Sequence, residues 1–254
     1  FVARDGDGRK LQKSFRNQGI CKSCEKNCRR RFVEEPLSIA YLKSFAADED
    51  LKSGNKFVPG IEAESGKTVA VIGEMAKSPR YQGAGSSLIN PTQVDDAYTE
   101  LRKKGCRVAY SRGYDKATDV PDGKLIDAAV ELAKKADVAV VFIGLTEVYE
   151  SEGFDRRHIE LPPAHNELVE AVAAVNENTV VVLSGGAAVT MPWLGKVKGV
   201  INGLLLGQAG GSATADIITG DVNPSGKLAE TYPLCLEDTP AYKNFPGRQL
   251  TVEY

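Results

Sequence analysis

Five short apolar runs, separated by amphipathic helical patterns, limit most strongly how this chain can fold. The runs cover residues 68–73, 107–110, 137–144, 178–183 and 199–206. Helical periodicity lies between and after them, at residues 94–104, 124–135, 165–175 and 211–219. Strands that alternate with helices of about ten residues are typical of βαβ units and a parallel sheet. Because the runs are apolar throughout, both sheet faces must be covered. We therefore expect an α/β fold, a three-layer sandwich with a mostly parallel, five- to six-stranded sheet.

Two connections in this pattern are unusually long, residues 74–93 after the first strand and residues 145–163 after the third. Loops longer than roughly 12–15 residues are uncommon in compact domains and are usually functional or disordered. Both connections follow the carboxyl end of a strand, which is where ligands bind in open α/β sheets. We expect both loops to emerge at the same edge of the sheet and to form the functional site there.

The second long loop is rich in charged side chains, namely Glu147, Glu150, Glu152, Asp155, Arg156 and Arg157. A carboxylic acid next to an apolar side chain such as Phe154 can keep its proton near neutral pH and act as a general acid. Glycoside hydrolysis uses two carboxyl groups on opposite sides of the scissile bond. Composition alone equally allows an acidic loop that only forms salt bridges with Arg156, so both interpretations stay open.

Other catalytic chemistries find less support in these residues. The sequence has two histidines, His158 and His165, and no G-x-S-x-G turn of the kind that presents a serine nucleophile. His165 stands at the start of a helix, where a hydrogen-bonding role is expected. The glycine-rich stretch Gly83-Ala-Gly-Ser86 lacks the third glycine of a dinucleotide-binding fingerprint and lies too far past its strand. A cofactor is therefore not expected.

Residues 1–66 are basic and poorly patterned. Residues 1–33 hold ten Lys and Arg against three Asp and Glu, a net charge of +7, which leaves −9 for the rest of a chain whose total is −2. A basic arm can bind nucleic acid, but no nucleic-acid motif accompanies this one, so a solvated linker is expected. Cys21, Cys24 and Cys28 lack the fourth ligand that a structural zinc site needs. We expect no metal and no nucleic-acid partner.

The remaining expectations concern location and assembly. No apolar run reaches the roughly 18 residues of a membrane span, so no membrane contact is expected. Five cysteines, an odd number without a disulfide framework, favour a reducing, cytoplasmic compartment. Secretion stays open, because the first residue is Phe1 instead of methionine and a leader could precede it. A homodimer is compatible with the sequence.

Eight short motifs then occur in a particular order. They are Val69-Ala-Val-Ile-Gly73, Gly83-Ala-Gly-Ser86, Glu150-Ser-Glu-Gly-Phe-Asp-Arg156, Leu161-Pro162, Val180-Val-Val-Leu183, Met191-Pro-Trp193, Gly207-Gln-Ala-Gly-Gly211 and Gly220-Asp-Val-Asn-Pro-Ser-Gly-Lys-Leu228. In this order they resemble the second, α/β-sandwich domain of family three glycoside hydrolases, especially bacterial β-glucosidase-like members. The resemblance covers residues 67–247, so residues 1–66 read as a linker and residues 248–254 as a truncated tail.

The resemblance implies the retaining hydrolysis of β-linked glucosides or oligosaccharides. In this family an amino-terminal barrel provides the nucleophilic aspartate, and the sandwich domain provides the acid/base glutamate on a loop that reaches the cleft between them. Glu152 matches the acid/base position, with Glu150 as the runner-up, and Ser86 matches the serine that lies near the innermost sugar. The resemblance also suggests residues that support the two loops, namely Gly85, Asp155 and Arg156.

One departure from the family pattern changes the expectation for activity. The segment before residue 67 is too short for the eight βα units of a barrel, so the chain is expected to carry half of an active site. Without a barrel partner it should be inactive. The alternative is a non-catalytic sugar-binding or interaction domain that keeps the same fold. Within the acidic loop, we expect the Glu150 side chain to point to solvent.

Overall fold

The computed structural model describes residues 66–244, which form a five-stranded sheet. Its strands are β1 (Thr68–Ile72), β2 (Arg107–Ser111), β3 (Val138–Gly144), β4 (Thr179–Ser184) and β5 (Gly199–Leu204). They lie in the order β2-β1-β3-β4-β5, and every neighbouring pair is parallel. The expected α/β sandwich with a parallel sheet is therefore confirmed, with five strands in the described residues.

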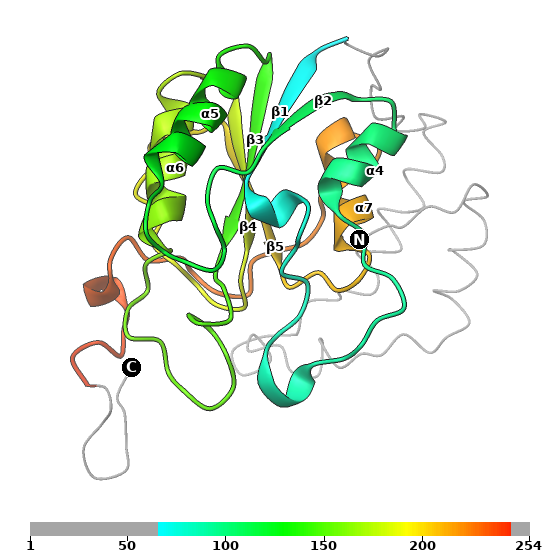
Figure 1. Ribbon diagram of the computed structural model, residues 1–254. Coiled ribbons are helices and arrows are strands. Elements are labelled where there is room, and N and C mark those ends of the chain that lie inside the picture. The colour runs from blue at the N-terminus through cyan, green and yellow to red at the C-terminus, as the bar shows by residue number, and fades with distance from the viewer. Residues whose placement is uncertain (1–65, 245–254) are drawn as a thin grey trace, which may run out of the picture. The chain divides into compact units, whose positions relative to one another are not determined.

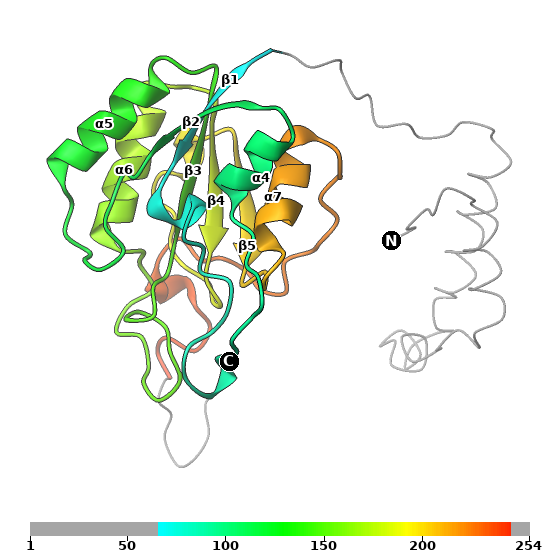
Figure 2. The same ribbon diagram turned by 45° about the vertical axis from the view of Figure 1, so that its right-hand side comes forward.

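Helices cover both faces of this sheet. Those in the described residues are α4 (Ala97–Lys103), α5 (Gly123–Ala133), α6 (Pro163–Ala173) and α7 (Gly210–Thr219). Short 3₁₀ turns are η2 (Glu74–Ala76), η3 (Gly85–Ser87), η4 (Leu194–Lys196) and η5 (Leu236–Asp238). Helices α5 and α6 lie on one face, and α4 and α7 lie on the other (Figures 1 and 2). This placement explains why the strands are apolar on both faces.

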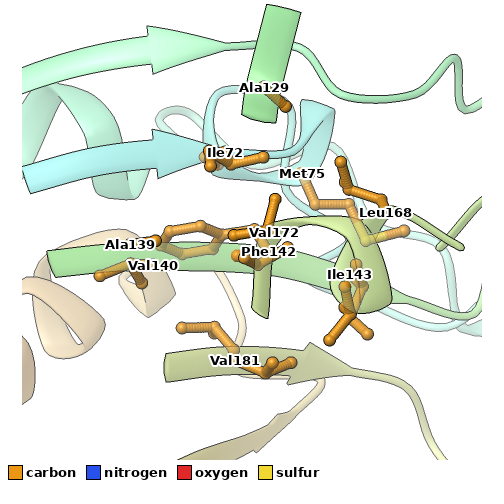
Figure 3. Close-up of a cluster of buried hydrophobic side chains, with 14 of the residues drawn as sticks. Ile72, Met75, Ala129, Ala139, Val140, Phe142, Ile143, Leu168, Val172 and Val181 are labelled. Carbon is orange, nitrogen blue, oxygen red and sulfur yellow. The ribbon is translucent and has the colours of Figure 1, made fainter. Parts of the chain in front are cut away.

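The core is built from the central strands and the helices that pack on them. Strand β3 has six buried residues in a row, Ala139 to Gly144. Figure 3 shows Ile72 of β1 and Val181 of β4 on either side of β3, with Leu168 and Val172 of α6 packed nearby. Buried apolar area of this kind is the main favourable term in folding. The central strands are thus a rigid base for the loops that leave them.

Element ends differ from the expected ranges for local reasons. Helix α4 begins at residue 97, three residues late, because the Asp96 carboxylate caps it by accepting from the Thr99 N–H at 2.8 Å. Helix α6 begins at Pro163, two residues early, since proline suits the first helical turn. Strand β5 stops at Leu204, whose φ of 50° leaves the extended region where the pairing with β4 shifts register.

The histidine expected to bond at the start of α6 is part of the core. The His165 side chain is 1% exposed, and its Nδ1 accepts from the Gly144 N–H at 3.3 Å. Its ring packs on the Tyr114 ring with centroids 3.9 Å apart, and the Tyr114 hydroxyl donates to the Phe142 carbonyl at 2.9 Å. Burial lowers the pKa of His165 from 6.5 to about 4. The side chain therefore has a structural role and folds in its neutral form.

We predict that this histidine makes the fold sensitive to acid. The unfolded chain takes up a proton at His165 below about pH 6.5, while the folded chain resists protonation down to about pH 4. The free energy of unfolding should therefore fall by about 2 kcal/mol between pH 7 and pH 4.5 through this group. Urea unfolding at both pH values measures it. His165→Gln should flatten the pH dependence by that amount, and His158→Gln, at an exposed site, should leave it unchanged. Equal slopes for wild type and His165→Gln would contradict the assignment.

Several expectations concern parts of the chain that the structure does not describe. The basic segment, including Cys21, Cys24 and Cys28, falls within residues 1–65, and the expected tail at residues 248–254 lies beyond residue 244. Between residues 66 and 244, no helix is long and apolar enough to cross a membrane. In the same residues, no group of three or more His, Cys, Asp or Glu side chains is arranged to hold a metal ion.

Candidate active site

The two long loops leave adjacent strands at the same edge of the sheet (Figures 1 and 2). One runs from β1 to α4 over residues 73–96, and the other from β3 to α6 over residues 145–162. Helix α4 covers one face of the sheet and α6 the other, so the connections diverge between β1 and β3. Open α/β sheets bind ligands at such a switch point, outside the carboxyl ends of the strands.

The structure brings Ser86 and Glu152 together across the two loops. The Ser86 N–H donates to Glu152 Oε2 at 2.6 Å, and the Glu152 side chain is exposed. Gly85 makes this approach possible. A Cβ atom at Gly85 would lie 2.5 Å from Glu152 Cβ and 2.7 Å from Oε2, and the backbone there has a φ of 86°. Only glycine fits this contact without displacing the carboxylate.

The charge state of Glu152 differs from the expectation. Hydrogen bonds from the Ser86 side chain and, to a smaller extent, from the Ser86 N–H lower the pKa of Glu152. Phe154, expected to shield the proton, is 50% exposed. Within the described residues the shift is therefore opposite to the direction that a general acid needs. Raising this pKa would require burial of the carboxyl group or a second carboxylate beside it.

Glu150 does not point to solvent, so that expectation was wrong. Its side chain is 20% exposed, and its Oε2 accepts from the Gly186 N–H at 2.8 Å. The same oxygen lies 3.4 Å from Arg80 Nη2. Glu150 is thus held by loops that follow β1 and β4, and both oxygens face groups of this domain. Glu152, two residues on, is the carboxylate that remains accessible.

Arg156 and Asp155 occupy different surroundings. Arg156 Nη2 donates to the Ala188 carbonyl at 2.9 Å, and the side chain is half-buried. Asp155 is exposed and forms no hydrogen bond or ion pair with the described residues. The Thr190 N–H donates to the Ile159 carbonyl at 2.9 Å, close to the Arg156 contact. The far end of the acidic loop is therefore braced by the loop after β4, through backbone carbonyls and without an Asp155–Arg156 ion pair.

Two clefts adjoin the loops. The first has a volume of about 330 Å³ and is lined by Arg80, Tyr81, Gln82, Lys116, Thr146 and Glu147, among others. Burial lowers the pKa of Lys116, whose Nζ donates to both oxygens of Ser78.

The second cleft has a volume of about 630 Å³, with Tyr149, Phe154, Arg157 and His158 in its wall. The Tyr149 hydroxyl donates to Asp119 at 2.9 Å, and burial and that carboxylate raise its pKa to about 12. Polar groups beside aromatic rings suit a small polar ligand.

Arg80 and Gly186 also belong to the site, although no sequence pattern predicted them. Arg80 is 8% exposed and donates to the Leu145 and Glu150 carbonyls at 2.8 and 2.7 Å. The only local signal was a lone arginine in Pro79-Arg-Tyr-Gln82, ahead of the glycine-rich stretch. Gly186 follows β4 in a segment that carried no motif. The local sequence at these two positions does not indicate a contact with the acidic loop, because Glu150, which both residues contact, lies far away in the sequence.

Fold and site together define a doubly wound α/β domain that presents the accessible carboxylate of Glu152 at the switch point of its sheet. The sequence model of the protein family described as "Glycosyl hydrolase family 3 C-terminal domain" matches residues 51–254. The chain therefore belongs to this family, as the ordered motifs indicated.

Relatives and solved structures agree with this membership. The chain is 53% identical over 190 residues to "Thermostable beta-glucosidase B" of Acetivibrio thermocellus, which covers 74% of this chain and 25% of that protein. It is 44% identical over 218 residues to "Exo-alpha-(1->6)-L-arabinopyranosidase" of Bifidobacterium longum, covering 85% and 28%. The crystal structure of a Bifidobacterium adolescentis GH3 beta-glucosidase superposes with a TM-score of 0.69 at 44% identity, covering 82% and 32%. The chain thus spans about a quarter to a third of the length of these relatives.

Proposed function

We propose that this chain is the acid/base half of a retaining glycosidase of the β-glucosidase type. The observation that carries the proposal is the Glu152 carboxylate, exposed at the switch point and held at 2.6 Å by the Ser86 N–H. The neighbouring carboxylate of Glu150 is engaged within the domain, so Glu152 is the acidic group of this pair that a substrate could reach. Several relatives are named as glycosidases, which supports the same assignment.

In this proposal Glu152 transfers protons at the leaving group. Its carboxyl group donates a proton to the glycosidic oxygen as the bond breaks, and its carboxylate then removes a proton from the attacking water. Retaining hydrolysis also needs a nucleophilic carboxylate about 5–5.5 Å from the acid. We assign that nucleophile to a barrel domain outside this chain. In this proposal Ser86 orients Glu152 through its N–H and also contacts the innermost sugar.

A docked barrel domain would also raise the pKa of Glu152, so that the carboxyl group could keep its proton. In this chain the carboxylate is exposed and Ser86 lowers its pKa, which favours the ionised form. A docked domain would remove water from the carboxyl group, and its own carboxylate would repel a second negative charge. Both changes raise the pKa of a carboxyl group. The proton-donating form therefore depends on a completed cleft.

The second candidate is a sugar-binding domain without catalysis. The observation in its favour is the same lowered pKa, because an ionised, exposed carboxylate is a good acceptor for sugar hydroxyl groups. The two candidates differ in one measurable respect. A binding domain should bind a glucoside without accelerating its hydrolysis, whether or not a barrel domain is present.

We predict that the pure 254-residue chain does not turn over nitrophenyl β-glucoside. Retaining hydrolysis needs two carboxyl groups about 5–5.5 Å apart, and the proposal assigns the second one to a barrel domain outside this chain. Mixing or fusing the chain with a family three barrel domain should produce hydrolysis, measured as release of nitrophenol. A barrel preparation alone is the control. Turnover by the chain alone would show that it holds its own nucleophile, and a silent, correctly folded fusion would favour the binding domain.

A further inference from the structure

Three loops of the carboxyl edge meet at one ion pair, in which Arg80 is buried and Glu150 is partly buried. Arg80, from the loop after β1, donates through Nη1 to the Leu145 carbonyl at 2.8 Å and through Nη2 to the Glu150 carbonyl at 2.7 Å. Its Nη2 also lies 3.4 Å from the Glu150 carboxylate. One guanidinium group thus binds the acidic loop at its first residue after β3 and again at residue 150. The planar guanidinium holds its donors in a rigid fork and can bind acceptors in fixed directions, whereas the ammonium of lysine is a compact charge on a flexible stem.

The third loop joins through Glu150. The carboxylate accepts from the Gly186 N–H at 2.8 Å, in the segment that follows β4. A Cβ atom at Gly186 would lie 2.9 Å from Glu150 Oε1 and 3.3 Å from Oε2, so a larger residue would push the carboxylate away. The pair therefore connects the loops after β1, β3 and β4. Figures 1 and 2 show that these connections leave the same edge of the sheet.

Stability alone does not account for this arrangement. The Arg80 side chain is 6% exposed, burial lowers its pKa, and its Nε is buried without a partner among the described residues. Removing two charges from water offsets much of the attraction between them, so buried pairs are often replaceable by apolar side chains without loss of stability. What such a pair supplies is a defined geometry. Here that geometry fixes the position of the glycine-rich loop relative to the acidic loop, and the tips of these two loops form the candidate site.

The pair lies on the same two loops as the Ser86–Glu152 contact. Glu150 precedes Glu152 by two residues, and Arg80 stands on the same loop as Gly85 and Ser86. The loop around Arg80 has further anchors, since the Tyr81 carbonyl accepts from the Gly207 N–H at 2.8 Å and both oxygens of Ser78 accept from Lys116 Nζ. Beyond these anchors, Ser86 and Glu152 are both exposed. Their separation is consequently set by the points where the two loops are held.

We propose that Arg80 and Glu150 form a positioning pair, which holds the glycine-rich loop and the acidic loop at the spacing that places Glu152 against Ser86. Neither residue touches the reacting atoms in this proposal. Its catalytic consequence rests on the proposed function of Glu152. The positioning itself is a property of this chain and can be tested without any activity.

The test uses NMR of the 254-residue chain at pH 7, where His165 does not weaken the fold. The readouts are the Ser86 amide proton shift and its hydrogen-exchange rate, because a carboxylate acceptor changes both. Glu152→Ala defines the values for complete loss of the contact. Arg80→Met and the double variant Arg80→Met/Glu150→Leu remove the pair, the second without leaving a buried charge. Arg80→Lys keeps the charge and loses the fork. Arg112→Met is the control, since Arg112 pairs with Glu74 at 3.0 Å elsewhere on this edge.

We expect all three Arg80 variants to move the Ser86 amide toward the Glu152→Ala values. Its exchange should accelerate by about tenfold or more, as expected when a local hydrogen bond is lost. Arg112→Met should match the wild type. The proposal is overturned if the cooperatively folded double variant keeps the wild-type Ser86 amide shift and exchange rate. Wild-type values in Arg80→Lys together with changed values in Arg80→Met would still support the pair, and would show that a positive charge at this position is enough to hold the two loops.

A kinetic measurement separates this proposal from the proposed function. In the chain fused to a barrel domain, the double variant should lower kcat and leave KM nearly unchanged, with the greatest loss for poor leaving groups. That pattern means that Glu152 is displaced while the sugar still binds. A fusion that is inactive even as wild type, together with the expected NMR changes, would refute the glycosidase assignment and leave the positioning pair intact. Normal kcat in the double variant, with a displaced Ser86 amide, would refute the catalytic consequence.

Discussion

Replacing Glu152 by alanine should lower the rate of glycoside hydrolysis by about 10²–10⁴-fold in the chain joined to its barrel domain, the usual range for loss of a general acid/base. The loss should be largest for alkyl glucosides, whose leaving oxygen needs a proton. It should be smaller for nitrophenyl glucosides, whose leaving group departs as a stable anion. Steady-state kinetics with both substrate types measures the difference.

Two comparisons make this prediction specific. Added azide should restore turnover of nitrophenyl glucosides by Glu152→Ala, because azide attacks the glycosyl-enzyme without help from a general base. Glu160→Ala is the matched control, as Glu160 is an exposed glutamate near the end of the same loop and should have little effect. If Glu150→Ala instead showed the leaving-group dependence and azide rescue, the acid/base role would belong to Glu150.

Gly85→Ala should reduce activity by about 10²-fold in the same fusion, the scale expected when a catalytic group moves by roughly 1 Å. The new Cβ would lie 2.5 Å from Glu152 Cβ, so the acidic loop must move away from Ser86. The Ser86–Glu152 hydrogen bond should break at the same time, which the Ser86 amide shift would report. The effect on kcat should exceed that on KM, because proton transfer depends most strongly on this spacing.

The backbone conformation of Gly85 requires a separate control. Alanine at a positive φ costs about 1–2 kcal/mol wherever it occurs, and Gly85 has a φ of 86°. Gly105 has a nearly equal φ of 81°, lies beyond the end of α4, and has open space around its Cβ position. Gly105→Ala should therefore reduce stability by a similar amount and leave kcat unchanged. Equal activity losses in both variants would mean that general destabilisation explains the result for Gly85.

The layout of the sandwich followed from the sequence because it depends on local patterns. Apolar, β-branched runs such as 137–144 form strands, and their unbroken hydrophobicity requires helices on both faces. Once the strands are parallel, loops that follow them must meet at one edge, so the proximity of the two long loops could also be predicted. The errors at element ends came from single residues, as with the Asp96 cap and the Leu204 backbone.

The roles within the acidic loop could not be read in this way. Glu150 and Glu152 stand two residues apart with the same side chain, yet one is held by Arg80 and Gly186 and the other meets Ser86. These partners lie 36 to 70 residues away in the chain.

The pKa of Glu152 is likewise lowered by the approach of Ser86, and its neighbour Phe154 is half exposed. Local periodicity therefore determined the layers and the edge where the site lies. Which carboxylate is free, and in which direction its pKa shifts, was decided by hydrogen bonds that form only when distant loops fold together.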